Sequence, residues 1–385
     1  MNRQRICVVT GSRAEYGLLY WVLHELRASV DVELQIIATG MHLAPEYGLT
    51  VRQIEADGFA VTRRVEMLLS SDSPSGVAKS LGLGVIGMSD ALSALVPDVV
   101  VVLGDRFEIL AAAQACLIHK IPLAHIAGGD VTEGAIDESI RHAITKMAQV
   151  HFVTNEDAAR RVRQMGEDPA RVFVVGSPGL DHLHRLPLLN RAELEFALGA
   201  PLGTKNLLIT FHPVTLEERE GLGELDALLS ALESTSADTC LWFTRPNADS
   251  GGRAISSRLD DFVARNPVRA QVYTSLGQLR YLSLMAQVDA VIGNSSSGLY
   301  EAPSFGVPTV NIGDRQRGRL AAASVLHCKA EQDTIAVSLQ RALSMDCTGV
   351  VNPYGDGHTA PRIVRVLRGL SRANTPLRKP FHPIA

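Results

Sequence analysis

The sequence of 385 residues has few aromatic side chains, no marked excess of one charge and no long apolar run. Aromatic residues make up 5%, which argues against a stacking platform for single-stranded nucleic acid. A net charge of -4 argues against a general binder of polyanions. Apolar runs such as Val99–Leu103 are far too short to cross a bilayer. Neither nucleic acid nor a membrane is therefore an expected partner.

Cysteine is also scarce in this chain. The five cysteines are scattered and form no C-x-x-C pair, a pattern typical of reduced thiols in the cytosol. The polar start, Met1 to Arg5, carries no apolar signal-peptide region, so we expect a cytoplasmic protein. Neither an H-E-x-x-H motif nor a cysteine pair indicates a metal site, and we interpret His182 and His184 as surface histidines.

Short apolar runs alternate with helical patterns along the chain. The runs expected as strands in the first part are Ile6–Thr10, Leu34–Ala38, Val99–Leu103, Pro122–Ile126, Val150–Thr154 and Val172–Val175. Those expected in the second part are Leu207–Thr210, Thr239–Thr244, Gln271–Tyr273, Ala290–Gly293 and Thr309–Ile312. Such alternation predicts α/β domains with parallel sheets that helices cover on both faces.

The chain length and a break in this pattern predict two domains. The stretch Gly176–Asn190, rich in Pro, Gly and Leu, separates residues 1–178 from residues 190–385, and the C-terminal helix could pack back on the N-terminal domain. Two doubly wound, Rossmann-like domains that face each other would bind ligands in a cleft at the carboxyl ends of their strands. Gly82–Gly87 matches G-x-G-x-x-G but follows a helical pattern, so we interpret it as a flexible or close-packed helical segment rather than a dinucleotide site.

Charged groups follow two predicted strands of the first domain. Gly11–Gly17 places backbone N–H groups and Arg13 at a helix start, which suits an anion, although an ordinary helix cap would look the same. Asp105 and Arg106 come directly after a buried strand, where charge is costly unless it is paired or used. A structural ion pair and a functional pair both fit, and we favour function.

A third cluster, His125–His142, begins at the next strand end. Two glycines allow a tight turn, and then several acids, Asp130 and Asp137 among them, open a helix. Some of these acids are plain helix N-terminal charges. Their number exceeds what capping requires, which indicates general acid–base chemistry on a sugar carbon.

The second domain offers four polar strand ends. They carry His212, Asn247, the Ser295–Ser296 pair with Glu301 in the following helix, and Arg315. A helix start rich in hydroxyl and N–H groups suits a diphosphate, and a carboxylate deeper in that helix suits ribose hydroxyls. Ser and Asn also cap ordinary helices, so the combination of four ends carries the interpretation.

Together these motifs resemble the hydrolysing UDP-N-acetylglucosamine 2-epimerases of the sialic acid and legionaminic acid pathways. The resemblance spans nearly the whole chain: GSRAEYGLLY at 11–20, GDRFE at 104–108, GGDVTEGAIDESIRHAITK at 128–146, HPVT at 212–215, GNSSSG at 293–298, GDRQRGR at 313–319 and YGDGHTAPRI at 354–363. It implies the GT-B arrangement of two Rossmann-like domains. It also implies conversion of UDP-N-acetylglucosamine and water to UDP and N-acetylmannosamine, without cofactor or metal, in a homodimer or homotetramer.

The same resemblance implies roles for individual residues. UDP would be held by Arg13, Asn247, Leu276 (through its backbone), Ser295, Ser296, Glu301 and Arg315, with the two serines on phosphate and Glu301 on the ribose. Asp105, Asp137 and His212 match positions that act on the sugar, which Arg106 would help to place. Relatives often carry a glutamate where this chain has Ala127. Asp130 is the nearest substitute and completes the catalytic set.

Several alternatives stay open from the sequence. The same reaction on UDP-N,N'-diacetylbacillosamine is the first, and the related non-hydrolysing 2-epimerase, which returns UDP to the sugar, is the second. A GT-B glycosyltransferase would need an acceptor groove or a membrane-facing patch, which the sequence does not indicate. A UDP-sugar sensor without activity is disfavoured because it has no use for the acidic cluster.

Overall fold

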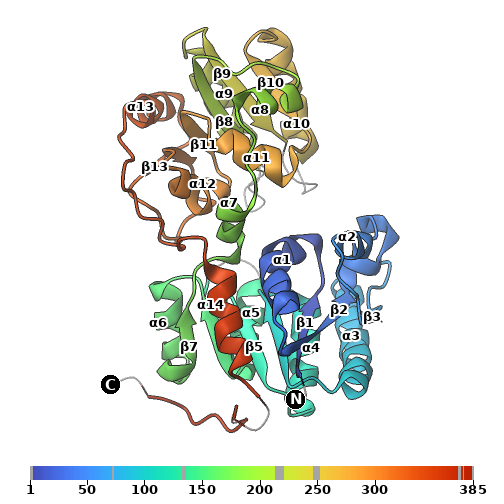
Figure 1. Ribbon diagram of the computed structural model, residues 1–385. Coiled ribbons are helices and arrows are strands. Elements are labelled where there is room, and N and C mark those ends of the chain that lie inside the picture. The colour runs from blue at the N-terminus through green and yellow to red at the C-terminus, as the bar shows by residue number, and fades with distance from the viewer. Residues whose placement is uncertain are drawn as a thin grey trace. The chain divides into compact units, whose positions relative to one another are not determined.

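The computed structural model describes residues 3–71, 73–131, 136–212, 221–245, 252–371, 374–375 and 377–383. The chain forms two compact units. The first contains Met1–His182 and Tyr354–Ala385, and the second contains Leu183–Pro353. Each unit has one parallel β-sheet with helices on both faces, which confirms the predicted α/β class (Figure 1). Among the described residues, no helix combines the length and apolarity needed to span a membrane.

The sheet of the first unit has seven parallel strands in the order β3-β2-β1-β4-β5-β6-β7. They are β1 (Gln4–Thr10), β2 (Val32–Thr39), β3 (Arg63–Val65), β4 (Val99–Leu103), β5 (Leu123–Ile126), β6 (Val150–Val153) and β7 (Val172–Val174). The sequence pattern indicated all of them except β3. This edge strand has only three residues, and its two arginines are exposed, so it carries no apolar run.

Alternating residues of β1 pack on opposite faces of that sheet, as its continuous apolar sequence requires. Ile6 and Val8 face α1 (Arg13–Ala28), α2 (Val51–Ala56) and α14 (Thr359–Arg368). Cys7 and Val9 face α3 (Pro74–Leu95), α4 (Phe107–Ile118) and α5 (Ile136–Met147). The remaining helices are α6 (Glu156–Gln164), which packs on β6 and β7, and the short α7 (Asp181–Arg185).

The last part of the chain, Tyr354–Ala385, belongs to the first compact unit. Ile363 and Leu367 of α14 are fully buried in the core that contains α1, and Figure 1 shows α14 beside α1. The buried carboxylate of Asp181 accepts hydrogen bonds from the backbone N–H groups of Thr359 and Ala360, both at 2.7 Å. A negative charge at a helix start is stabilising, so Asp181 fixes where α14 begins.

The two histidines of α7 and the Gly82–Gly87 segment also lie in the first part of the chain. His182 is buried, not on the surface as predicted, because Nδ1 accepts from Trp21 Nε1 and Nε2 donates to the Gly17 carbonyl, both at 3.0 Å. His184 is exposed, as predicted. The Gly82–Gly87 segment lies inside α3 and is closely packed, since a Cβ on Gly84 would stand 2.6 Å from Met67 Cε.

The sheet of the second unit has six parallel strands in the order β10-β9-β8-β11-β12-β13. They are β8 (Lys205–Thr210), β9 (Thr239–Thr244), β10 (Ala270–Tyr273), β11 (Ala290–Gly293), β12 (Thr309–Ile312) and β13 (Val325–Cys328). One face packs on α9 (Leu222–Glu233), α10 (Gly252–Arg265) and α13 (Gln332–Leu343). The other packs on α8 (Arg191–Leu198) and α11 (Gly277–Met285), while the short α12 (Ser297–Tyr300) follows β11.

Strand order reverses once in each sheet, between β1 and β4 in the first unit and between β8 and β11 in the second. Loops leave such a reversal in opposite directions, which opens a crevice at the carboxyl ends of the two strands. The loops at these positions contain Ser12, Asp105, His212 and Ser295. The topology therefore puts Asp105, His212 and Ser295, three of the residues that the sequence singled out, at the preferred ligand position of each sheet.

Candidate active site

Arg141 is the centre of the polar site in the first unit. Its side chain is only 5% exposed and projects from α5. One end of the guanidinium pairs with the carboxylate of Asp105, while Nη1 donates to the backbone oxygen of Asp130 at 2.5 Å and to Glu138 Oε2 at 3.2 Å. Arg141 thereby joins the loops after β4 and β5. Arg141 lies within the motif at residues 128–146, but the sequence alone indicates no role for it.

His125, on β5, holds the loop that carries Asp105. His125 is fully buried, and its Nε2 lies 2.8 Å from the carbonyl oxygen of Gly104, while Nδ1 lies 3.2 Å from Thr145 Oγ1. Burial lowers the pKa of His125 to about 3, so the ring is neutral. Because a carbonyl only accepts, the proton is on Nε2. This neutral histidine holds the residue before Asp105 in place.

Asp130 and Asp137 differ in their surroundings. Thr154 Oγ1, at the end of β6, donates to Asp130 Oδ1 at 2.5 Å, so this carboxylate is engaged on the β6 side. Asp137 lies in the first turn of α5, and its charge acts on Arg106. The first unit thus brings Asp105, Asp137 and Arg106 together, whereas Asp130 contributes its backbone to Arg141 and its carboxylate to Thr154.

Arg106 belongs to a second ion network that the sequence analysis missed. Its Nε and Nη2 donate to the two oxygens of Glu108 at 3.2 and 3.0 Å, and Glu15 Oε1 lies 3.9 Å from Nε. Burial lowers the pKa of Arg106, but the charges of Glu108, Glu15 and Asp137 outweigh it and raise the value overall. The two glutamates stand inside the motifs GSRAEYG and GDRFE, and only their burial reveals them. Arg13, which the sequence singled out in the first of these motifs, is exposed.

Glu15 is the unusual acid of this network. Burial raises its pKa to about 8, the backbone N–H of Gly11 at 2.7 Å opposes that rise, and the charge of Glu108 adds to it. At neutral pH the carboxyl is therefore mostly protonated. A neutral Glu15 lowers the repulsion that two adjacent buried carboxylates would otherwise create.

In the second unit, hydrogen bonds join the loops after β8, β11 and β12. The buried Asn294 accepts from the backbone N–H of His212 at 2.7 Å and donates to the His212 carbonyl at 2.9 Å. Arg315 Nη1 and Gln316 Nε2 donate to the Asn294 carbonyl at 3.0 and 2.8 Å. Gly293 has φ +131, and a Cβ there would stand 1.9 Å from the Thr210 carbonyl oxygen. Only glycine allows β8 and β11 to end so close together.

A chain of hydroxyl groups leads away from this junction. Ser295 Oγ lies 3.1 Å from Ser297 Oγ, which lies 2.6 Å from the hydroxyl of Tyr281 on α11. Ser296 caps α12. Burial raises the pKa of Tyr281 to about 12, so it remains a neutral donor. Tyr281 was missed in the sequence because it lies within an ordinary helical pattern.

Two further predicted residues, Glu301 and Leu276, lie next to α12 and α11. Glu301 directly follows α12, and among the described residues its buried Oε2 has no hydrogen-bond partner. Burial raises the pKa of Glu301 to about 8. Leu276 is buried at the start of α11. Asn247 lies outside the described residues.

Comparisons with known proteins identify the family of this chain. The sequence matches the profile of the UDP-N-acetylglucosamine 2-epimerase family over residues 24–368. It is 44% identical over 326 residues to the GDP/UDP-N,N'-diacetylbacillosamine 2-epimerase (hydrolyzing) of Campylobacter jejuni, covering 85% of this chain and 84% of the relative. The chain belongs to the hydrolysing branch of the UDP-N-acetylglucosamine 2-epimerase family.

Other members and structures extend the comparison. The UDP-N,N'-diacetylbacillosamine 2-epimerase (hydrolyzing) of Legionella pneumophila is 36% identical over 95% of this chain and 96% of its own. The structure of UDP-GlcNAc 2-epimerase from Neisseria meningitidis, bound to UDP-GlcNAc, has a TM-score of 0.77 at 20% identity, covering 94% of this chain and 99% of that one. The fold is the GT-B-like fold of these epimerases, and the protein is a hydrolysing UDP-sugar 2-epimerase.

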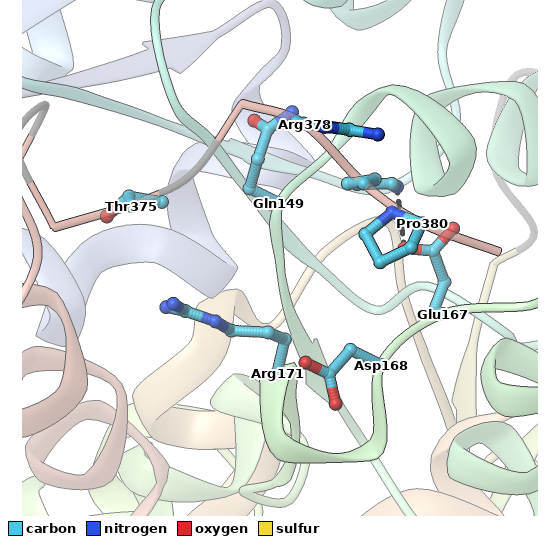
Figure 2. A pocket seen from close by; sticks show the side chains of 8 residues that line it. Gln149, Glu167, Asp168, Arg171, Thr375, Arg378 and Pro380 are labelled. Atoms are coloured by element: carbon cyan, nitrogen blue, oxygen red, sulfur yellow. Dashed lines mark ion pairs between the residues drawn. The ribbon is translucent and has the colours of Figure 1, made fainter. Parts of the chain in front are cut away.

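A cavity of about 60 Å³ lies at the opposite edge of the first sheet, before β6 and β7. Figure 2 shows Glu167, Asp168 and Arg171 in its wall together with tail residues such as Arg378. Glu167 accepts from Lys379 Nζ at 2.6 Å, so the charges there anchor the C-terminal tail. Ligand pockets usually measure about 300–1,000 Å³, so a cavity of about 60 Å³ is too small for a nucleotide sugar. The described residues contain no cluster of three or more His, Cys, Asp or Glu suited to a metal.

Proposed function

We propose that this epimerase acts on UDP-N,N'-diacetylbacillosamine and releases UDP and the free sugar with C2 inverted. The observation that carries the substrate is the 44% and 36% identity to two epimerases named for that sugar, over 85% and 95% of the chain. The sequence motifs alone favoured UDP-N-acetylglucosamine and left this sugar as the alternative. Greater similarity to the diacetylbacillosamine enzymes reverses that order.

The second unit holds UDP in this proposal. Ser295, Ser296 and Arg315 bind the diphosphate, to which Arg13 adds charge from the first unit. Ribose hydroxyls supply the partner that Glu301 Oε2 lacks among the described residues. Leu276, through its backbone, and Asn247 contact the rest of the nucleotide.

The first unit carries out the chemistry. A carboxylate takes the proton from C2 while the C1–O bond to UDP breaks, and its electrons leave with the diphosphate to give a 2-acetamidoglycal. The C2 proton is weakly acidic, so stabilisation of the departing diphosphate supplies much of the barrier reduction. We assign proton transfer to Asp105 and Asp137, which lie near Arg106, and placement of the sugar to Arg106.

Hydration completes the reaction. Water adds its oxygen to C1 of the glycal, and a proton is delivered to C2 on the face opposite the one that lost it. Inversion therefore needs two proton-transfer groups on different sides of the ring. We assign His212 to the second side and Asp130 to support of the site, since Thr154 already binds its carboxylate.

The test is to incubate the purified protein separately with UDP-N,N'-diacetylbacillosamine and UDP-N-acetylglucosamine and to identify both products by NMR. We expect free UDP and a free manno-configured sugar, with kcat/KM at least tenfold higher for the diacetylated compound. A higher kcat/KM for UDP-N-acetylglucosamine would contradict the proposed substrate. Accumulation of an epimerised sugar still attached to UDP would contradict hydrolysis.

A further inference from the structure

A cavity beside Arg106 has no role in the reaction described above. Its volume is about 360 Å³, and it lies at the carboxyl edge of the first sheet where the segments after β2, β3 and β4 meet. Met41, Leu68, Leu69 and Phe107 give it apolar walls, and Arg106 contributes a guanidinium. The other polar residues that line it are Glu46, Tyr47, Ser70, Ser71, Ser80 and Glu108. A cavity of this size that combines apolar walls with polar groups is typical of a small-ligand subsite.

The wall that contains Leu69 is held in a fixed position. The backbone N–H of Leu69 donates to Oγ of the buried Ser80 on α3 at 3.0 Å. Met67 is buried under α3, where Gly84 makes room for it. The glycines of the G-x-G-x-x-G match thus serve close packing of the segment that lines the cavity, so the cavity exists before any ligand binds.

Arg106 presents a donor to this cavity without offering an unbalanced charge. Glu108 binds Nε and Nη2, and Nη2 also lies 3.8 Å from Met41 Sδ. Among the described residues, none accepts a hydrogen bond from Nη1. Because Glu108 already balances the charge, an anion would gain little here, whereas a neutral carbonyl oxygen suits the remaining protons. Next to apolar side chains, such a donor fits an acetamido group, whose methyl needs an apolar wall.

The strand order indicates which acetamido group this is. The acidic α5, with Asp137, follows β5 on one side of β4, whereas the cavity extends toward β2 and β3 on the other side. Neighbouring strands are about 4.8 Å apart, and β2 and β3 are the second and third strands from β4. An acetamido group on C2, the carbon that reacts near Asp137, therefore does not reach the far wall of the cavity. We propose that the cavity binds the acetamido group at C4 of the sugar and selects for it. This assignment rests on the proposed function.

The test compares UDP-N,N'-diacetylbacillosamine with an analogue that is identical except for a free amine at C4. Leu69 is 41% exposed, so Leu69→Trp fills the cavity without disturbing the core. Leu117→Trp is the matched control, since Leu117 is 53% exposed at the far end of α4. One lost apolar contact in a specificity pocket changes kcat/KM by roughly 10- to 200-fold. We therefore expect wild-type enzyme and the control to prefer the acetylated compound at least tenfold and Leu69→Trp to lose most of that preference.

The outcomes separate the cavity from the substrate. A preference that Leu69→Trp leaves unchanged, or that is absent from the wild type, overturns the assignment of the cavity while the hydrolysis of UDP-N,N'-diacetylbacillosamine stands. If the enzyme turns over UDP-N-acetylglucosamine but neither UDP-N,N'-diacetylbacillosamine nor its C4-amine analogue, the proposed substrate and the C4 assignment are both overturned. Thermal melts of both tryptophan variants show that a lost preference does not come from unfolding.

Discussion

At the reversal of strand order, arginine–carboxylate pairs join the loops of the first unit, whereas hydrogen bonds of the Asn294 amide and of Arg315 join those of the second. Arg106 and Arg141 each pair with carboxylates around the loop after β4. At the equivalent place in the second unit, Asn294 and Ser297 make neutral hydrogen bonds, and Arg315 donates to the Asn294 carbonyl. Burial raises the pKa of the nearby Glu301. The difference suits a division of labour in which the arginine–carboxylate pairs of the first unit serve proton transfer, while the hydroxyl groups and Arg315 of the second unit hold the diphosphate.

Asp105→Asn should produce the largest effect if the carboxylates around the loop after β4 carry out the proton transfer. We expect kcat to fall by roughly 10²- to 10⁴-fold, because a proton-transfer group and the partner of Arg141 are lost together. UDP affinity, measured by calorimetry, should stay close to wild type. Asp98→Asn is the control, because Asp98 precedes the other end of β4, where it pairs with Arg5. Near wild-type turnover by Asp105→Asn would remove this residue from the mechanism.

Arg315→Ala tests the proposed diphosphate site of the second unit. It removes one charge-assisted contact to phosphate, so UDP affinity should fall by about 10- to 100-fold. The exposed Arg317, two residues along, provides the matched control Arg317→Ala. Calorimetry with UDP alone separates binding from chemistry. Equal affinities for the two variants would show that the diphosphate is not bound at the end of β12.

The raised pKa of Glu15 predicts a pH effect on the stability of the first unit. Its folded value of about 8 exceeds its ordinary value of 4.5, so the folded state keeps a proton that the unfolded state releases. The stabilisation is complete below about pH 4.5 and is lost as the pH rises through 8, with a slope of up to about 1.4 kcal/mol per pH unit. Glu15→Gln should flatten this slope in urea unfolding. Parallel curves for variant and wild type would contradict a protonated Glu15.

The smallest predicted effect concerns Ala127, directly after the end of β5. Its φ of +64 lies in the left-handed region, which costs a non-glycine residue roughly 1–2 kcal/mol. Ala127→Gly should raise the free energy of unfolding by less than about 1 kcal/mol, because glycine loses more entropy on folding. Chemical denaturation measures the change. A clear loss of stability would show that the methyl group packs too well to be dispensable.

The sequence was sufficient for the two sheets and for most strands, because continuous apolar runs such as Val99–Leu103 are read without tertiary information. It missed β13, where His327 interrupts a short run. The burial of His182 was also missed, since it depends on Trp21 from a distant helix. The same limit applies to the site: motifs revealed Asp105, but its partner Arg141 is visible only once α5 is in place.

The central claim is that this epimerase inverts C2 by eliminating UDP and hydrating the resulting glycal. The most direct measurement is the reaction of UDP-N,N'-diacetylbacillosamine in D₂O, followed by NMR and mass spectrometry of the released sugar. We predict one deuterium at C2 and free UDP, because the C2 proton leaves in the first step and solvent supplies its replacement. A free C2-inverted sugar that retains its original C2 hydrogen would contradict the account.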